Sequence, residues 1–372
     1  MRYPYNAPKG TAADGAVVLL KIGLCGAGAG ILARKEDEKA MNYPEIIAHR
    51  GASYLAPENT LSAFQKAMEI GADGVEMDVQ QTLDGSLVIH HDYIIDLHTD
   101  ITGKIYDMLY EDLRELDFGS WKDAIYEGER IATLQEALEL CKGMEGTVVQ
   151  LELKSTMDND PEFLPRVIEA IRQADMTDRL VLISFNHDLL RQAKQLMPEL
   201  KVGVLLYGAL ETMVLPTGMW EFLGLQNDLE DDKNDFLDLP FDPAALDDDN
   251  CSQTTRWLND KLSMLRANFP GESMRAVVRH LMAQRDPEEY VKSLDFHPDY
   301  VSCEFHTSYQ QPTLVQRLHK LGVKVAFWTV DTEEEIMDLL PLEPDCIVTN
   351  RPDRMREWLD AALKPEQQTA EE

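Results

Sequence analysis

The chain has 372 residues, 44% hydrophobic and 27% charged, a composition typical of a globular protein with one large domain or two ordinary ones. A formal net charge of -32 argues against a nucleic-acid binder and means that any phosphate site must be locally positive. The five cysteines are scattered and include no C-x-x-C pair, which argues against a zinc site and a disulfide framework.

Residues 16–33 form an apolar, glycine-rich stretch about as long as a membrane span, interrupted by Lys21. A secretory signal carries its positive charge before the apolar part, and this pattern is not found here. Two interpretations stay open for residues 16–33: a membrane anchor or membrane-surface segment, which would bring the protein into contact with a membrane, or a helix docked on the protein body. We treat residues 1–44 as a separate segment and expect a cytoplasmic or membrane-associated protein.

From residue 45 onward, short apolar runs alternate with amphipathic helical stretches, which indicates parallel β/α units. Barrel strands are expected at 46–48, 74–79, 148–153, 180–185, 202–206, 301–305, 325–330 and 346–348, with one more strand at 86–91. Helices are expected at 61–70, capped by Asn59 or Thr60, and at 134–141, 163–174, 189–197, 314–321, 334–340 and 355–363. The pattern predicts an α/β fold, a (β/α)8 TIM-type barrel over residues 45–363, with a polar tail at 364–372.

A minimal barrel needs about 250 residues, and the surplus lies at about residues 208–295, after the fifth barrel strand. This insertion is rich in Asp at 228–249, and its sequence predicts helices at 253–268 and 274–282. One interpretation is a solvated acidic loop with a helical hairpin. The other is a lid, because the insertion leaves the carboxyl end of a strand, where the active sites of such barrels lie. The Asp run is too irregular for an EF-hand loop, and a weak cation buffer is a further alternative.

Chemically active side chains gather where the first strands end. His49 and Arg50 follow the first strand, while Glu76 and Asp78 lie at i, i+2 on the second and therefore share one face. Two carboxylates this close repel each other unless a cation lies between them.

The next barrel strand repeats this arrangement with Glu152 and Lys154. His91 ends the short strand at 86–91, and Asp92 follows it directly. Oxygen ligands favour Ca²⁺ or Mg²⁺ over zinc, and Arg and Lys suit a phosphoryl group. Two histidines can act as general base and general acid near neutral pH. Each feature alone has an ordinary structural explanation, but their combination at strand ends predicts metal-assisted phosphodiester cleavage.

The stretch HRGASYLAPENTLSAF…VIHHD, from His49 to Asp92, resembles the glycerophosphodiester phosphodiesterase family. The likeness continues at 116–121, 132–138, 151–154, 184–186, 327–331 and 348–352. By motif match, the resemblance implies a (β/α)8 barrel with His49 and His91 as the acid–base pair, the spacing from Glu76 selecting His91 over His90.

The same resemblance implies roles for the remaining residues. The metal ligands would be Glu76, Asp78 and Glu152, and Arg50 and Lys154 would bind the phosphate of a small-molecule phosphodiester. Glu58 would position the site, Asp92 would support it, and Trp328 would line the pocket.

Two features depart from the family pattern. The Arg-Thr-Thr run that usually follows the His-Asp pair is replaced by Asp96-Leu97-His98-Thr99, which removes an expected cation, and the insertion is unusually long. The resemblance implies hydrolysis of glycerophosphodiesters to glycerol 3-phosphate and an alcohol. The alternatives are a lysophospholipase D at a membrane and an idle barrel that binds a phosphorylated ligand or a partner.

Overall fold

The computed structural model describes residues 43–144, 146–155, 160–207 and 253–363. The apolar stretch at 16–33, the Asp-rich part of the insertion at 228–249 and the tail at 364–372 lie outside the described residues. Within the described ranges, no helix combines the length and the apolar character that a membrane crossing requires.

One sheet contains all the strands of the described residues, namely β1 (Glu45–Ala48), β2 (Gly74–Gln81), β3 (Leu87–Ile89), β4 (Val148–Leu153), β5 (Leu180–Ser184), β6 (Lys201–Leu206), β7 (Tyr300–Glu304), β8 (Lys324–Trp328) and β9 (Cys346–Thr349). Neighbouring strands pair in parallel in the order β1-β9-β8-β7-β6-β5-β4-β2, and a β1–β2 pairing closes the ring. β3 pairs antiparallel with β2 and is not part of the ring. The predicted (β/α)8 barrel is therefore confirmed.

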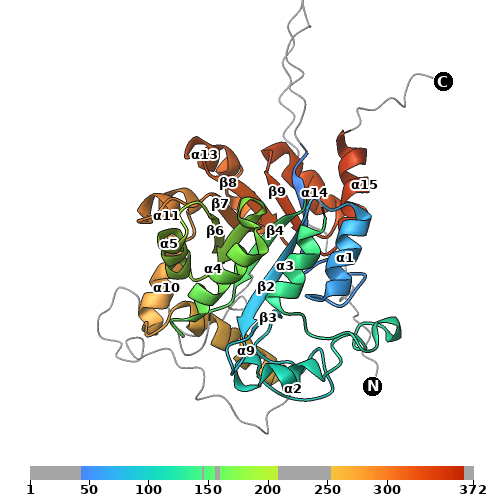
Figure 1. Cartoon of the computed structure of the whole chain (residues 1–372). Helices are drawn as coiled ribbons and strands as arrows, with labels where there is room; N and C mark the ends of the chain where they lie inside the picture. The colour runs from blue at the N-terminus through green and yellow to red at the C-terminus, as the bar shows by residue number, and fades with distance from the viewer. Residues whose placement is uncertain (1–42, 145, 156–159, 208–252, 364–372) are drawn as a thin grey trace, which may run out of the picture. The chain divides into compact units, whose positions relative to one another are not determined.

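Helices connect the strands and surround the barrel in Figure 1. The α-helices are α1 (Leu61–Ile70), α2 (Tyr110–Arg114), α3 (Leu134–Lys142), α4 (Phe163–Ala174), α5 (His187–Leu196), α9 (Gln253–Asn268), α10 (Met274–Ala283), α11 (Pro287–Ser293), α12 (His306–Gln310), α13 (Leu314–Lys320), α14 (Glu333–Leu339) and α15 (Pro352–Leu363). Short 3₁₀ helices are η1 (Ile105–Asp107), η2 (Ala124–Tyr126), η3 (Thr177–Arg179) and η6 (Leu340–Leu342).

The barrel wall separates two apolar layers, because successive side chains of a strand point to opposite faces. On β1, Ile46 and Ala48 join the large cluster between the wall and the helices, whereas Ile47 belongs to a smaller cluster inside the barrel. On β2, Val75 and Met77 also face the helices. The intervening residues of β2 must therefore point into the barrel.

The segment from β1 to β2 folds as its sequence predicts. Helix α1 has the predicted bounds, and the Thr60 side chain caps it by accepting the Ala63 N–H at 3.2 Å. The alternative cap, Asn59, instead donates its side-chain amide to Asp78 Oδ2 at 2.7 Å. The predicted strand at 86–91 is shorter in the structure, because only Leu87–Ile89 pairs with β2.

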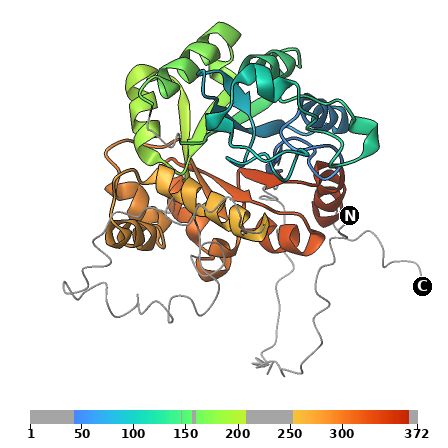
Figure 2. The same cartoon turned by 90° about the horizontal axis from the view of Figure 1, so that it is seen from below.

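The described part of the insertion, between β6 and β7, consists of α9, α10 and α11. Both predicted helices, 253–268 and 274–282, are present as α9 and α10. Leu265 and Phe269 pack with Val277 and Leu281, and Tyr207 lies against this cluster. In Figure 2, which views the barrel from below, the gold helix α9 lies across the end where the strands finish.

Candidate active site

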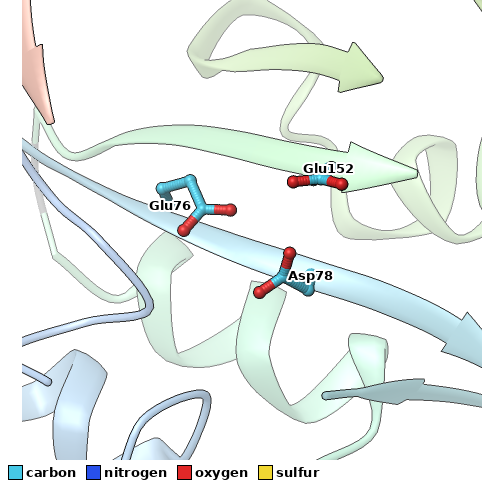
Figure 3. Close-up of side chains that lie close together, drawn as sticks. All are labelled: Glu76, Asp78 and Glu152. Carbon is cyan, nitrogen blue, oxygen red and sulfur yellow. The ribbon is translucent and has the colours of Figure 1, made fainter. Parts of the chain in front are cut away.

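Three carboxylates converge inside the barrel near the carboxyl ends of β2 and β4 (Figure 3). Asp78 is the direct register partner of Glu152 on the neighbouring strand, and Glu76 lies two residues earlier on the same face as Asp78. One oxygen of each carboxylate lies within 4.8 Å of the others, and all three residues are buried. The predicted trio is therefore brought together.

Two cations partly balance this negative charge. Lys154 Nζ lies 2.5 Å from Glu152 Oε1 and 3.0 Å from Asp78 Oδ1. Arg50 Nε lies 3.6 Å from Asp78 Oδ2, and the Arg50 backbone N–H donates to Glu76 Oε2 at 2.9 Å. The cations and the carboxylates thus form one compact polar cluster.

Arg50 and Lys154 do not fully compensate the three carboxylates, and the pKa values of these carboxylates are shifted accordingly. Burial, followed by the charges of Asp78 and Glu152, raises the pKa of Glu76 well above its usual value. Burial raises the pKa of Glu152 to about 7, although Lys154 opposes the shift. Burial would also raise the pKa of Asp78, but Lys154, His91 and Arg50 together hold it below its usual range. A further cation at this position would relieve the repulsion.

The donor set fits a hard divalent cation. All three groups are carboxylates, and no sulfur or imidazole lies among the ligand atoms of this cluster. Asp78 Oδ1 is buried, and its partner among the described residues is the Lys154 ammonium, which lies 3.0 Å away without hydrogen-bond geometry. Oxygen-only ligands of this kind are typical of Ca²⁺ and Mg²⁺ sites.

His49 follows β1 and is oriented by an amide. Its Nδ1 lies 2.8 Å from Asn350 Oδ1, which also accepts the Ser53 hydroxyl at 2.8 Å. The Asn350 amide nitrogen donates to Asp331 Oδ2 at 2.6 Å, and because a carboxylate only accepts, this bond fixes the amide orientation. His49 therefore carries its hydrogen on Nδ1, and Nε2 faces Glu76 Oε2 at 3.9 Å. Burial lowers the pKa of His49 to about 4.

His91 follows β3 and is oriented by a carboxylate. Its Nδ1–H donates to Asp92 Oδ1 at 2.6 Å, and among the described residues the opposite ring nitrogen, Nε2, has no hydrogen-bond partner. Asp92 Oδ1 also accepts Lys261 Nζ at 2.6 Å. Burial, followed by the charges of Arg50, Lys154 and Lys261, lowers the pKa of His91 well below its usual value.

Glu58 lies on the loop after β1 and contacts a guanidinium and an imidazole. Its Oε1 accepts Arg50 Nη1 at 2.7 Å and lies 4.0 Å from His98 Nε2. His98, from the stretch that departs from the family pattern, therefore lies beside Glu58. His90 is a buried neighbour, with Nε2 3.1 Å from His98 Nδ1 and Nδ1 2.8 Å from the Asp92 carbonyl.

Trp328 ends β8 beside two further aromatic residues at strand ends. Its ring meets Phe185 edge-on at 5.9 Å, and Phe185 lies 4.3 Å from Tyr207. Phe185 and Trp328 both pack against the apolar cluster inside the barrel. Together they form an aromatic wall at the carboxyl ends of β5, β6 and β8.

Sequence reasoning did not assign Asp331, Asn350 or Lys261 to the site. Asp331 and Asn350 lie within motifs that resemble the family, so the motif itself carried a signal for them. Lys261 has no such signal, because a lysine in a helical insertion looks like any solvated charge. The contact of Lys261 with Asp92 is visible only in the three-dimensional structure.

Comparisons with known proteins identify the family of this site. The sequence profile of the Glycerophosphoryl diester phosphodiesterase family matches residues 49–224 and 247–354. The chain belongs to this family. A glycerophosphodiester phosphodiesterase of Caldanaerobacter subterraneus subsp. tengcongensis is 43% identical over 160 residues, which cover 43% of this chain and 65% of that protein. One from Bacillus altitudinis is 36% identical over 164 residues, which cover 43% of this chain and 66% of that protein. The chain thus spans just under two thirds of these relatives' length.

Solved structures of the family share the fold. An Oleispira antarctica phosphodiesterase in complex with the product sn-glycerol-3-phosphate matches with a TM-score of 0.58 and 26% identity, over 85% of this chain and 97% of that one. A putative glycerophosphoryl diester phosphodiesterase from Silicibacter pomeroyi matches with a TM-score of 0.58 and 25% identity, over 86% and 93% of the two chains. The glycerophosphoryl diester phosphodiesterase barrel therefore accounts for most of this chain.

Proposed function

We propose that the protein is a metal-dependent phosphodiesterase that hydrolyses glycerophosphodiesters to glycerol 3-phosphate and an alcohol. The observation that carries the proposal is one cluster with two oriented imidazoles, three carboxylates and two cations. Family membership supports the reaction class, and the product bound to the Oleispira antarctica phosphodiesterase supports the substrate class.

In this proposal, Glu76, Asp78 and Glu152 hold a divalent cation, which when bound supplies positive charge for the phosphate and its developing negative charge. Arg50 and Lys154 lie beside these carboxylates and bind the non-bridging phosphate oxygens. Glu58 holds the Arg50 guanidinium, and Trp328 bounds the pocket through the aromatic wall.

We assign the two histidines different roles from their partners. His49 donates to a neutral amide, so its Nε2 lone pair accepts a proton from the attacking water or substrate hydroxyl. The oxygen then bonds to phosphorus while the bond to the leaving alcohol breaks. His91 donates Nδ1–H to the Asp92 carboxylate, and in this proposal Nε2 takes up a second proton when the anionic phosphodiester is bound. Asp92 stabilises the resulting imidazolium against the burial that lowers the pKa of His91, and the Nε2 proton then passes to the departing alkoxide.

Release of glycerol 3-phosphate from glycerophosphocholine tests the proposal. Chelation by EDTA is expected to abolish the activity, and Ca²⁺ or Mg²⁺ to restore it. His49→Ala should lower kcat by about 10²- to 10⁴-fold. Glu76→Gln should weaken the restoration by metal, while Glu69→Gln, exposed on α1, should behave as the wild type. Full activity in EDTA, or a His49→Ala variant with unchanged kcat, contradicts the proposal.

A second candidate is lysophospholipase D activity at a lipid surface. It is favoured by two large, exposed aromatic side chains beside the site, Tyr54 at 56% and Trp121 at 39% exposure, the latter 4.6 Å from His98 between ring centroids. Lys122 lies over the rings of both, which joins Tyr54 and Trp121 into one rim. Hydrolysis of lysophosphatidylcholine vesicles without hydrolysis of glycerophosphocholine would select this candidate, and the reverse result would reject it.

A further inference from the structure

The insertion helix α9 contacts the segment that carries His91. Lys261 Nζ lies 2.6 Å from Asp92 Oδ1, the same oxygen that accepts His91 Nδ1–H at 2.6 Å. The preceding residue, Asp260, accepts the Ile94 backbone N–H at 3.1 Å. Two consecutive residues of α9 therefore hold the chain directly after His91.

The far end of α9 is also attached to the barrel. Asn268 Oδ1 accepts the Ser155 hydroxyl at 3.0 Å, and its amide nitrogen donates to the Tyr207 hydroxyl at 2.7 Å. Ser155 follows Lys154, and Tyr207 follows β6. Seven residues separate Lys261 from Asn268, so both side chains leave nearly the same face of the helix. Contacts at both positions fix where the Lys261 ammonium lies.

The Lys261–Asp92 pair differs from an ordinary surface ion pair. The Asp92 side chain is only 7% exposed, and that of Lys261 is 32% exposed. A buried carboxylate is costly unless a charged partner compensates it. The His91 imidazole and the Lys261 ammonium both contact Asp92 Oδ1. If Lys261 were removed, His91 would be the remaining partner described for that oxygen.

We propose that Lys261 is a positioning residue for His91, acting through Asp92, and that the insertion helix α9 is thereby part of the catalytic site. This inference rests on the proposed function, in which His91 handles a proton. It goes beyond that function because the lysine comes from an insertion after β6, far along the chain from His91. The insertion would then control the geometry of the reaction rather than only cover the site.

The test compares three substitutions of Lys261 with a matched control. Lys261→Met keeps the length of the side chain without its charge, Lys261→Gln keeps a donor without the charge, and Lys261→Arg keeps the charge. The control is Lys292→Met in α11, which removes a lysine that pairs with Glu288 at 2.7 Å elsewhere in the insertion.

Lys261→Met and Lys261→Gln should lower kcat on glycerophosphocholine by about 10- to 100-fold, with a change in KM of less than about twofold. Lys261→Arg should recover most of kcat, and Lys292→Met should match the wild type. Wild-type kcat in Lys261→Gln would overturn the proposal, as would equal losses in the Lys261→Arg and Lys261→Met variants.

Nuclear magnetic resonance of the His91 ring gives a readout that needs no turnover. In Lys261→Met the ring should titrate at a higher pH than in the wild type, because a positive charge has left its carboxylate partner. The other charged groups described around His91 are the same in both proteins, namely Arg50, Glu58, Asp78, Asp92 and Lys154. An unchanged His91 titration overturns the proposal. If the wild type hydrolyses no glycerophosphodiester, the proposed function fails while this titration still tests the role of Lys261.

Discussion

At the scale of single residues, Asn350 determines which nitrogen of His49 can accept a proton. The amide cannot rotate freely, because Asp331 accepts its nitrogen at 2.6 Å and its backbone N–H at 2.8 Å. The oxygen must therefore face His49. This arrangement performs with an amide and a carboxylate what hydrolytic triads perform with a carboxylate alone.

Asp331→Asn should lower kcat at least about 100-fold while leaving the fold intact, because the new amide can repel the Asn350 nitrogen and turn that side chain over. The turned amide would offer hydrogens to His49 Nδ1 and move the ring hydrogen to Nε2. Steady-state kinetics together with circular dichroism check this prediction.

The matched control for this prediction is Asp338→Asn, because Asp338 is exposed on α14. It should retain wild-type kcat. An Asp331→Asn variant with the kcat of the control would show that the Asn350 orientation does not depend on Asp331.

The sequence predicts the carboxylates of the cluster better than it predicts the orientation of His49 or the position of Lys261. Glu76, Asp78 and Glu152 follow from strand periodicity, because i, i+2 spacing and strand pairing leave few other placements. The orientation of His49 could not follow from local sequence, since its partner lies 301 residues away. Lys261 was missed for the same reason. The metal and the catalytic roles stay proposals.

At the scale of elements, the turn between β1 and α1 has an unusual backbone conformation at the residues next to the carboxylate cluster. Arg50 has φ 56° and Gly51 has φ 79°, both in the left-handed region. A Cβ on Gly51 would lie 2.6 Å from the backbone carbon of Ala63 in α1. The close approach of this turn to α1 holds the Arg50 N–H toward Glu76.

Gly51→Ala should destabilise the protein by about 2–4 kcal/mol, because the left-handed conformation and the overlap with Ala63 both count against it. It should also lower kcat, since Arg50 must shift. Urea denaturation and glycerophosphocholine kinetics check both effects.

Gly71→Ala is the matched control, because Gly71 has φ 87° but no atom within 4 Å of an added Cβ. This variant should lose only about 1 kcal/mol and keep its kcat. Equal destabilisation by the two substitutions would contradict the argument from crowding.

Elements with strong local signals were predicted well. The helix at 61–70 has a capping threonine and a left-handed glycine at its end, so both of its boundaries were correct. The helices α9 and α10 were also predicted, and a position at the carboxyl end of the strands was one of the two alternatives for the insertion, but the contact of α9 with Asp92 was not predicted. Helical periodicity shows which face of a helix is apolar, but it does not show which distant loop the helix contacts.

At the scale of the whole molecule, His187 connects the barrel to the insertion. Its Nε2–H donates to the Leu205 carbonyl at 2.9 Å, and its Nδ1 accepts the Tyr290 hydroxyl at 2.6 Å. Tyr290 belongs to α11 and also lies 2.9 Å from His280 Nε2 in α10. One buried imidazole therefore joins α5, β6 and two helices of the insertion.

This imidazole should make the stability of the protein depend on pH. Burial lowers the pKa of His187 from 6.5 to about 4. The unfolded chain thus binds a proton between pH 6.5 and about 4 that the folded chain does not, and stability falls as the pH falls through this window. Between pH 7 and pH 5 the loss from His187 alone should be about 2 kcal/mol.

In His187→Gln the free energy of unfolding should therefore fall by about 2 kcal/mol less between pH 7 and pH 5 than in the wild type, as measured by urea denaturation. His49 and His98 keep part of the dependence, because burial lowers the pKa of each to about 4. His297→Gln, at an exposed position, should keep the wild-type slope. If the free energy of unfolding of His187→Gln depended on pH as it does in the wild type, His187 would not be a source of the acid sensitivity.

The pairing of β1 with β9 also has a consequence for the order in which activity appears during biosynthesis. His49 leaves the ribosome early, whereas Asn350, which orients it, follows 301 residues later. At a synthesis rate of 5–20 residues per second, this interval lasts roughly 15–60 s. By its end, the nascent chain carries the three carboxylates and His49 but still lacks the bond that orients the imidazole. Under the proposed mechanism, hydrolysis therefore requires the last strand to close the ring, and a chain interrupted before β9 should show none.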